Sequence, residues 1–255
     1  GMLAVLAGIA AYFFLINSPQ DAKFLDKDEK KALLDVMALE DGVKEETGPR
    51  GVLAAMKNGK VWYFTVIYFC LQVAVYGVTF YLPQQVAQLT GQKVGLAVGL
   101  MAAIPWFFGI FACYFIGKAA NTVIRRRVWG TGLFISTGLC IFGSAWAGAN
   151  HIPALGIIFI SLAVCSFLSI GPIAWSYPTA FLTGTAAAAG IGLINSLGNL
   201  GGFVAPILRT SVNQMTASDT GTMGVYALGV LPFLAAAMMF ATKRFRNKAD
   251  ELLEQ

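Results

Sequence analysis

Charge is scarce in this sequence. Only 12% of its 255 residues are Asp, Glu, Lys or Arg, whereas a typical soluble domain has about 25%. Residues 152–208 form a run of 57 positions without any of these four residue types or a histidine. A soluble core cannot bury such a run, but a bilayer needs about 20 apolar residues for each helix. The lack of charge therefore predicts an all-α, multi-pass membrane protein.

The residues that catalytic and metal sites need are also scarce. No acidic residue lies inside any apolar run, although proton relays and ion sites within membranes usually need a carboxylate. There is one histidine, His151, and none of the four cysteines has a Cys-x-x-Cys or Cys/His spacing. We expect no metal, no cofactor and no enzymatic activity. The net charge of +5 does not indicate nucleic-acid binding, because the basic residues lie in short segments between apolar runs.

The N-terminal part divides into an apolar and a charged segment. Residues 1–16 are apolar but too short to span a bilayer upright, and they lack the basic start and cleavage site of a signal peptide. We interpret them as the end of a transmembrane helix whose beginning lies outside this chain. Residues 17–60 are predicted to form a cytoplasmic loop. In it, Asp26 and Glu29 predict a capped helix that ends near Leu39.

Six membrane spans are predicted between residues 61 and 242. The uncharged run of 57 residues would be about 86 Å long as one helix, against a hydrocarbon core of about 30 Å, so it must fold back. Pro178 and the polar residues 183–185 mark the turn. A cytoplasmic tail is predicted at 243–255. The predicted spans are residues 61–82, 94–117, 128–150, 154–177, 186–208 and 220–242.

The basic residues predict the orientation of these spans. If residues 17–60 are cytoplasmic, alternation places 16 of the 18 Lys and Arg residues on the cytoplasmic side. The opposite side holds only Lys93 and Arg209. This distribution agrees with the positive-inside rule. We interpret Arg209, at the outer end of the fifth span, as an anchor that reaches the lipid headgroups.

Two stripes of neutral polar residues run along otherwise apolar spans. The first span carries five such residues on one face of a helix: Thr65, Tyr68, Gln72, Tyr76 and Thr79. The fifth span carries another set on one face: Gly192, Asn195, Asn199, Gly202 and Pro206. Such side chains are costly against lipid, so they face other helices or a water-filled cavity. Hydrogen bonding between helices is the alternative to a cavity. For Gln72, Tyr76 and Asn195 we favour the cavity, and for Asn199 both interpretations stay open.

A third feature lies at the end of the fourth span. Pro172 and Pro178 each remove a backbone donor, which frees carbonyl groups and permits bending. Interrupted helices of this kind line substrate cavities in transporters. The polar and aromatic side chains between the prolines, Trp175 and Ser176, are therefore candidates for substrate contact. Aromatic residues at this position also belong to the interfacial belt of many membrane proteins, and this alternative stays open.

Several segments resemble one transporter family. Residues 18–25 (SPQDAKFL), 76–83 (YGVTFYLP), 177–190 (YPTAFLTGTAAAAG) and 194–203 (INSLGNLGGF) are similar to the anion:cation symporters of the major facilitator superfamily. The resemblance extends over essentially the whole chain, from the end of the sixth helix through the twelfth. It implies a six-helix C-terminal bundle, and bacterial relatives that import organic anions such as tartrate, sugar acids, phthalate and hydroxyphenylacetate.

The resemblance also implies roles for particular residues. Asn195 corresponds to the substrate asparagine of the eleventh helix, and Tyr76 to the cavity aromatic of the seventh. Trp175 and Ser176 correspond to the polar group of the tenth. The loop between the eighth and ninth helices usually contains an acid and a turn glycine. Here that loop has Asn121 and Ile124 in their places, followed by Arg125, Arg126 and Arg127, which departs from the charge relay that latches the two transport states.

The sequence thus predicts a secondary active transporter in the bacterial inner membrane. We expect proton-coupled uptake of a small organic anion by alternating access, with the lipid bilayer and an N-terminal six-helix half as partners. The residues that pair with substrate charge and carry the proton would lie in that half. Two alternatives remain, a drug or cation exporter of the same superfamily and a self-contained six-helix membrane scaffold.

Overall fold

The computed structural model describes residues 2–16, 18–49, 51–217 and 221–245. The chain divides into two units, residues 1–47 and residues 48–255. The first unit contains α1 (Met2–Phe14), a 3-10 turn η1 (Pro19–Asp21) and α2 (Lys27–Thr47). The Asp26 N–H donates to Glu29 Oε2 at 3.0 Å and so satisfies a free donor at the start of α2. The prediction that this helix ends near Leu39 is wrong, because the Gly48-Pro49 pair is the first strong terminator that the chain meets.

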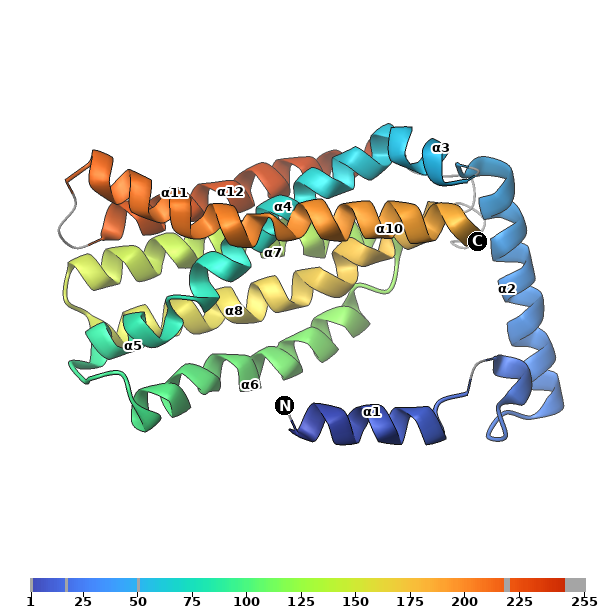
Figure 1. Ribbon diagram of the computed structural model, residues 1–255, viewed down its shortest axis with the longest axis horizontal. Helices are drawn as coiled ribbons and strands as arrows, with labels where there is room; N and C mark the ends of the chain where they lie inside the picture. The colour runs from blue at the N-terminus through green and yellow to red at the C-terminus, as the bar shows by residue number, and fades with distance from the viewer. Residues whose placement is uncertain (1, 17, 50, 218–220, 246–255) are drawn as a thin grey trace. The chain divides into compact units, whose positions relative to one another are not determined.

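The second unit contains the bundle (Figure 1). Its elements in the described residues are α3 (Val52–Lys57), α4 (Gly59–Thr79), α5 (Leu82–Thr90), α6 (Leu96–Ala119), α7 (Val123–Ala149), α8 (Pro153–Ser176), α9 (Pro178–Phe181), α10 (Gly184–Asn199), α11 (Gly201–Met215), α12 (Thr222–Ala241) and the 3-10 turn η2 (Thr242–Phe245).

Six helical segments in the described part of the chain are long and apolar enough to cross a bilayer. Four of them are the single helices α4, α6, α7 and α12, and two are pairs, Pro153–Phe181 (α8 with α9) and Gly184–Met215 (α10 with α11). The prediction of an all-α, multi-pass membrane fold is confirmed. The fifth segment extends further than the predicted 186–208, and the predicted tail lies mostly outside the described residues.

Local sequence signals set the boundaries of several helices. Asn58 begins α4, because its side-chain oxygen accepts a hydrogen bond from the Lys60 N–H at 2.8 Å. Thr122 begins α7 in the same way, accepting from the Arg125 N–H at 3.3 Å. Gly91 ends α5 with a φ of 67°, a left-handed conformation that glycine adopts without strain.

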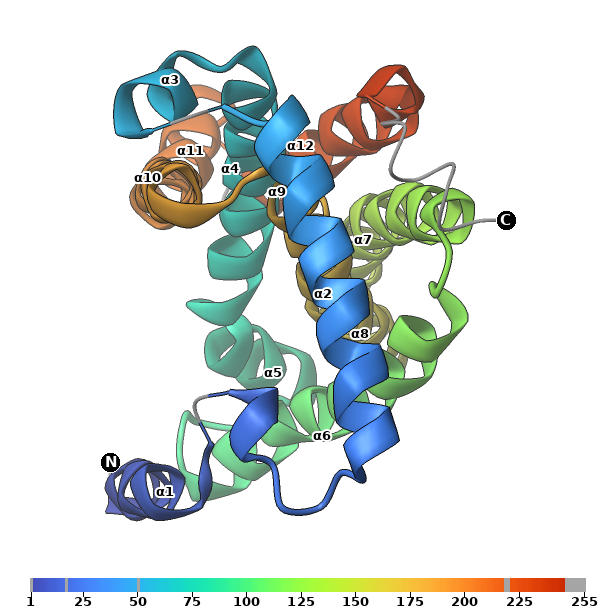
Figure 2. The ribbon, with the colours of Figure 1, turned by 90° about the vertical axis from the view of Figure 1, so that its right-hand side faces the viewer.

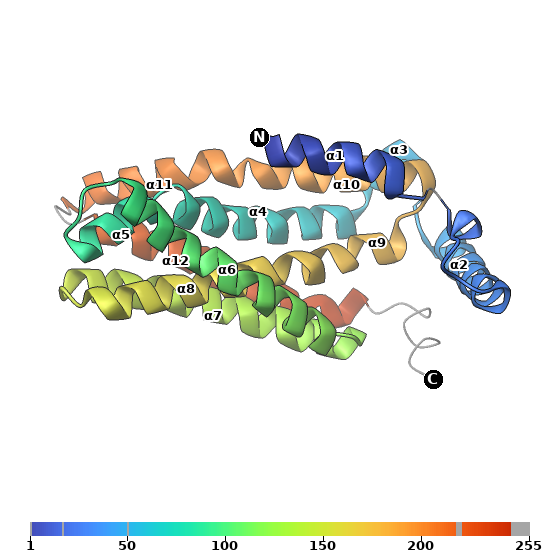
Figure 3. The same ribbon diagram turned by 90° about the horizontal axis from the view of Figure 1, so that it is seen from below.

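Some helices of the bundle pack on their neighbours in the chain, and others pack on helices distant in sequence. α7 packs against α8 and α12, α6 packs on α8, and α4 packs against α12, α10 and α11. Figures 2 and 3 show α10 and α11 in line with each other and alongside α4. The interior is mostly apolar, with Phe134, Phe167 and Ile67 among its largest fully buried side chains. α6 and the α10–α11 segment are the least buried of the six spans.

The fourth span is not interrupted at Pro172, contrary to the prediction. α8 runs without a break from Pro153 to Ser176, and the chain bends only at Tyr177-Pro178, where α9 begins. A proline has no N–H to donate to the carbonyl four residues earlier, here Leu168. The Cys113 thiol of α6 donates to that carbonyl oxygen at 3.2 Å. A side chain from another helix thus satisfies the carbonyl that Pro172 frees.

Candidate functional site

Three glycines allow α10 and α11 to approach α4 closely. A Cβ on Gly198 would lie 2.2 Å from the Tyr68 ring, and one on Gly202 would lie 2.9 Å from the Tyr76 ring. A Cβ on Gly201 would lie 2.8 Å from both the Phe69 carbonyl oxygen and a backbone nitrogen of α4. We call this contact surface between α4 and α10–α11 the seam. Because small residues line it, polar side chains from both helices come within hydrogen-bonding distance.

Four polar side chains meet in the seam and form what we call the amide cluster: Gln72 and Tyr76 of α4, and Asn195 and Asn199 of α10. Gln72 Nε2 donates to Asn199 Oδ1 at 2.6 Å, and the Tyr76 hydroxyl donates to the same oxygen at 3.2 Å. Asn199 Nδ2 donates to the Asn195 carbonyl oxygen at 2.8 Å and to Asn195 Oδ1 at 2.9 Å. The two stripes of the sequence therefore face each other.

Asn195 and Asn199 differ in how many of their hydrogen-bonding groups already have a partner. An asparagine amide has two donor hydrogens and an oxygen with two lone pairs. Asn199 uses all four, so it has no capacity left for another group. Asn195 is exposed, and the described residues provide no acceptor for its Nδ2. The cluster thus contains one saturated amide at its centre and one amide with two free donors at its edge.

An aromatic contact extends the cluster toward the fourth span. The rings of Tyr68 and Trp175 meet edge to face with centroids 4.9 Å apart, and Tyr68 also lies against Gly198. Trp175 is therefore placed next to the seam. Tyr68 was part of the predicted stripe but was not chosen as a site residue. Its contact with Gly198 shows that it lies in the seam.

Other residues selected from the sequence do not join the cluster. The Ser176 hydroxyl donates to the Ile173 carbonyl of its own helix at 2.7 Å. Thr65, in the predicted stripe, is buried and donates to the Val61 carbonyl at 2.8 Å. These hydroxyl groups are satisfied within their own helix and add no donor to the seam.

Of the residues predicted in the loop between the second and third spans, only Asn121 lies before α7, and the three arginines lie in the first turns of that helix. Arg125 Nη1 donates to Asn121 Oδ1 at 3.2 Å, and Arg126 Nε donates to the Ala120 carbonyl at 3.3 Å. Arg127 Nε is buried and has no hydrogen-bond partner among the described residues. Asn121 thus bonds a cation in the first turn of α7, and the resembling family usually has an acid at its position.

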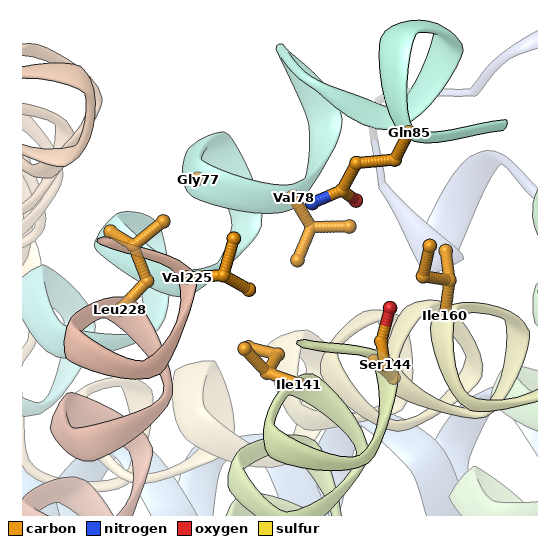
Figure 4. Close-up of a pocket in the computed structure, with 9 residues that line it drawn as sticks. Gly77, Val78, Gln85, Ile141, Ser144, Ile160, Val225 and Leu228 are labelled. Carbon is orange, nitrogen blue, oxygen red and sulfur yellow. The ribbon is translucent and has the colours of Figure 1, made fainter. Parts of the chain in front are cut away.

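A small pocket lies between the helices α4, α5, α7, α8 and α12 (Figure 4). Its walls are mostly apolar, and the Gln85 amide and the Ser144 hydroxyl are its only polar side chains. The pocket contains no charged side chain and shares no residue with the amide cluster.

The chain belongs to the Major Facilitator Superfamily, because the family model of that description matches residues 1–206. It is 36% identical to the inner membrane transport protein RhmT of Escherichia coli over 98% of this chain and 56% of that protein. It is 31% identical to a protein of Agrobacterium vitis named "Putative tartrate transporter", over 97% of this chain and 54% of that protein.

The name of a third relative refers to drug resistance. The chain is 27% identical to the quinolone resistance transporter of Acinetobacter baumannii, over 91% of this chain and 52% of that protein. The chain therefore spans about half the length of the curated relatives that it matches. These relatives are named as transporters and not as enzymes, and with six apolar spans the chain is an integral, multi-pass membrane protein.

Proposed function

We propose that this chain is the C-terminal half of a secondary transporter that imports an organic anion together with a proton by alternating access. The substrate would be a small carboxylate, such as tartrate, a sugar acid or an aromatic acid. We place the transporter in the bacterial inner membrane, with an N-terminal six-helix half supplying the remaining part of the binding site. The observation that carries the proposal is the amide cluster, a group of polar side chains in an otherwise apolar seam.

The free hydrogen-bonding groups of the cluster suit a carboxylate. Asn195 Nδ2 has two donors without an acceptor, and Gln72 Nε2 has a second donor beyond the one that it gives to Asn199. A carboxylate accepts such donors with both oxygens. We assign substrate contact to Asn195 and Gln72, with Tyr76 and Trp175 forming the aromatic wall. Asn199 is a positioning residue, because its own hydrogen bonds hold three of these groups together.

Two further sets of residues have other roles in this proposal. Ser176 lies at the end of α8, and its bond to the Ile173 carbonyl supports the bend before α9. Asn121 in the loop before α7, with Arg126 and Arg127 in the first turns of that helix, would contact the N-terminal half during the change of state. The proton-carrying carboxylate would belong to the N-terminal half, since residues 48–217 contain no Asp or Glu.

Uptake by the full-length protein in proteoliposomes tests this proposal. A panel of labelled carboxylates identifies the substrate, and Asn195→Ala is expected to raise its KM about tenfold, the loss typical of a hydrogen bond to a charged group. Ser161→Ala is the matched control, because the Ser161 hydroxyl donates to its own helix at Ile157 and lies outside the seam. Uptake that Asn195→Ala leaves unchanged would contradict the assigned role.

The second candidate function is drug export, which the similarity to the quinolone resistance transporter favours. A cationic drug would be stabilised by carboxylates, and the described spans contain none. The direction of proton movement separates the two functions. Substrate added outside right-side-out vesicles drives protons inward for a symporter and outward for an exchanger.

A further inference from the structure

A second polar feature lies at the far end of the seam, where α4 ends. Tyr81 occupies the break between α4 and α5, and Arg209 lies in α11. The guanidinium carbon of Arg209 is 3.7 Å from the centroid of the Tyr81 ring. This geometry is a cation–π contact, in which the face of the guanidinium lies on the ring. That Arg209 reaches the lipid headgroups stays a prediction, and the contact with Tyr81 is a partner that the sequence did not indicate.

The Arg209 side chain is held at both ends. A Cβ on Gly224 of α12 would lie 2.7 Å from Arg209 Cγ, so the aliphatic stem packs directly on the backbone of that helix. The Gly224 N–H donates to Asn213 Oδ1 at 2.6 Å, which joins α11 to α12 beside the stem. With the stem on Gly224 and the head on Tyr81, the guanidinium has a fixed place before any ligand arrives.

The guanidinium has a donor without an acceptor. Arg209 Nη1 is buried and has no hydrogen-bond partner among the described residues. A buried charged donor without an acceptor is unfavourable, because it loses water without replacement. No Asp or Glu occurs in residues 48–217 or 221–245. Asp219, the acid closest to Arg209 along the chain, lies outside the described residues.

The contact with Tyr81 determines which group would complete the site. Tyr81 covers one face of the guanidinium, and the five N–H donors of an arginine lie in its plane and point outward from the edge. A carboxylate approaches that edge with two parallel hydrogen bonds. A neutral sugar or a cation offers no equivalent match, so the chemistry selects an oxyanion, and the proposed function makes that oxyanion a carboxylate.

We propose that Arg209 and Tyr81 form a second anion site, separate from the amide cluster, that binds a carboxylate of the transported substrate. The inference rests on the proposed function. Arg209 lies ten residues after Asn199, about 15 Å along the helical segment. A small hydroxy acid does not reach both positions at once, so the anion occupies them in turn. By the charge distribution of the sequence, the Arg209 site is the one near the outer surface.

The test uses the full-length protein in proteoliposomes, with labelled tartrate as the probe and threitol as its neutral analogue. Arg209→Gln is expected to raise the KM for tartrate about tenfold, with the saturated rate within about twofold. Threitol is expected to compete no better and no worse in this variant than in the wild type. Tyr81→Leu raises the KM in the same direction, whereas Tyr81→Phe keeps the ring and the wild-type KM.

Two control variants exclude other roles of the charge. Lys93→Gln removes the other basic residue on the predicted outer side, and Lys93 is exposed. An equal rise in KM for Lys93→Gln would mean that surface charge attracts the anion and would overturn the site. Asp219→Asn tests an internal partner. If it and Arg209→Gln each lower the melting temperature of the ligand-free protein without a change in KM, Arg209 pairs with an acid of the protein, and the proposal is wrong.

The outcomes also separate this inference from the proposed function. If Asn195→Ala raises the KM for tartrate and Arg209→Gln does not, the second site is wrong and the proposed function stands. If the wild-type protein neither binds nor accumulates tartrate or any other carboxylate of the panel, the proposed function fails and the second site fails with it.

Discussion

Two regions of the bundle use glycine in the same way but with different partners. In the packing of α7 with α8 and α12, glycines lie under phenylalanine rings: a Cβ on Gly138 would meet Phe233, one on Gly143 would meet Phe159, and one on Gly229 would meet Phe142. In the seam, the rings over the glycines are tyrosines: Tyr68 over Gly198 and Tyr76 over Gly202. In both regions, a glycine on one helix leaves room for an aromatic ring of the neighbouring helix, so the two helices lie close together.

The difference is what the ring carries. A phenylalanine ring completes an apolar contact and contributes burial and dispersion. A tyrosine ring fills the same space and adds a hydroxyl, which Tyr76 donates to Asn199. The comparison teaches that the close approach is structural in both regions and that the polar atoms distinguish the candidate site. A substitution that only changes side-chain volume should therefore lower stability in either region. A substitution that removes a polar atom should impair transport only in the seam.

The largest effect is expected for Gly201→Ala. The added methyl would meet the Phe69 carbonyl and a backbone nitrogen of α4, and backbone atoms cannot move aside without separating the helices. Such overpacking costs about 1–3 kcal/mol. We expect a lower melting temperature of the full-length protein and loss of uptake. Gly132→Ala is the control, since nothing lies within 4 Å of that position. Equal melting temperatures for the two variants would contradict the close approach in the seam.

Asn199→Ala is expected to have the next largest effect. It removes the acceptor of Gln72 and Tyr76, and partner groups left unsatisfied cost about 1–3 kcal/mol. Uptake should fall about tenfold or more, because the remaining side chains of the cluster lose their fixed positions.

The control for Asn199→Ala lies between α7 and α8. Ser136→Ala breaks the hydrogen bond between the Ser136 and Ser166 hydroxyls, 2.9 Å apart. It should lower the melting temperature of the protein but leave the KM unchanged. A similar loss of uptake in both variants would mean that stability, and not the cluster, determines transport.

The sequence alone predicts features that depend on local composition. Span number and fold class follow from runs without charge, and the faces of Gln72, Tyr76, Asn195 and Asn199 follow from helical spacing. Whether the two stripes meet is a question of tertiary packing, and it depends on which helices become neighbours. Only the packing of α10 on α4 reveals that Asn199 is saturated while Asn195 is free.

Two positions show what the sequence alone does not contain. Pro172 was expected to interrupt α8, but a thiol from α6 satisfies the carbonyl that the proline frees. For Arg209, the end of α4 brings a tyrosine under its guanidinium, a contact that the sequence did not indicate. In each case a group distant in sequence compensates for a local preference. Spacing along a single helix contains no information about such a partner.

Tyr76→Phe makes the seam resemble the phenylalanine–glycine packing of α7 with α8 and α12. The ring over Gly202 remains, so the melting temperature should change little, by the equivalent of about 1 kcal/mol. The lost hydroxyl releases one lone pair of Asn199, and we expect the KM to rise a fewfold. Tyr226→Phe is the control, because the Tyr226 ring packs on Phe142 and its hydroxyl makes no hydrogen bond to the residues that the structure describes. A KM that rises equally in both variants would disprove a specific role for the Tyr76 hydroxyl.

The smallest effect is expected at the thiol that supports Pro172. Cys113→Ala leaves the Leu168 carbonyl without a donor, so stability should fall by about 0.5–1.5 kcal/mol, while the KM should not change because Cys113 lies outside the seam. Cys113→Ser keeps a donor at the same position and should retain most of the stability. Thermal unfolding of the full-length protein distinguishes the two variants. If alanine and serine lower the melting temperature equally, the volume of the sulfur stabilises this contact, and the hydrogen bond to Leu168 does not.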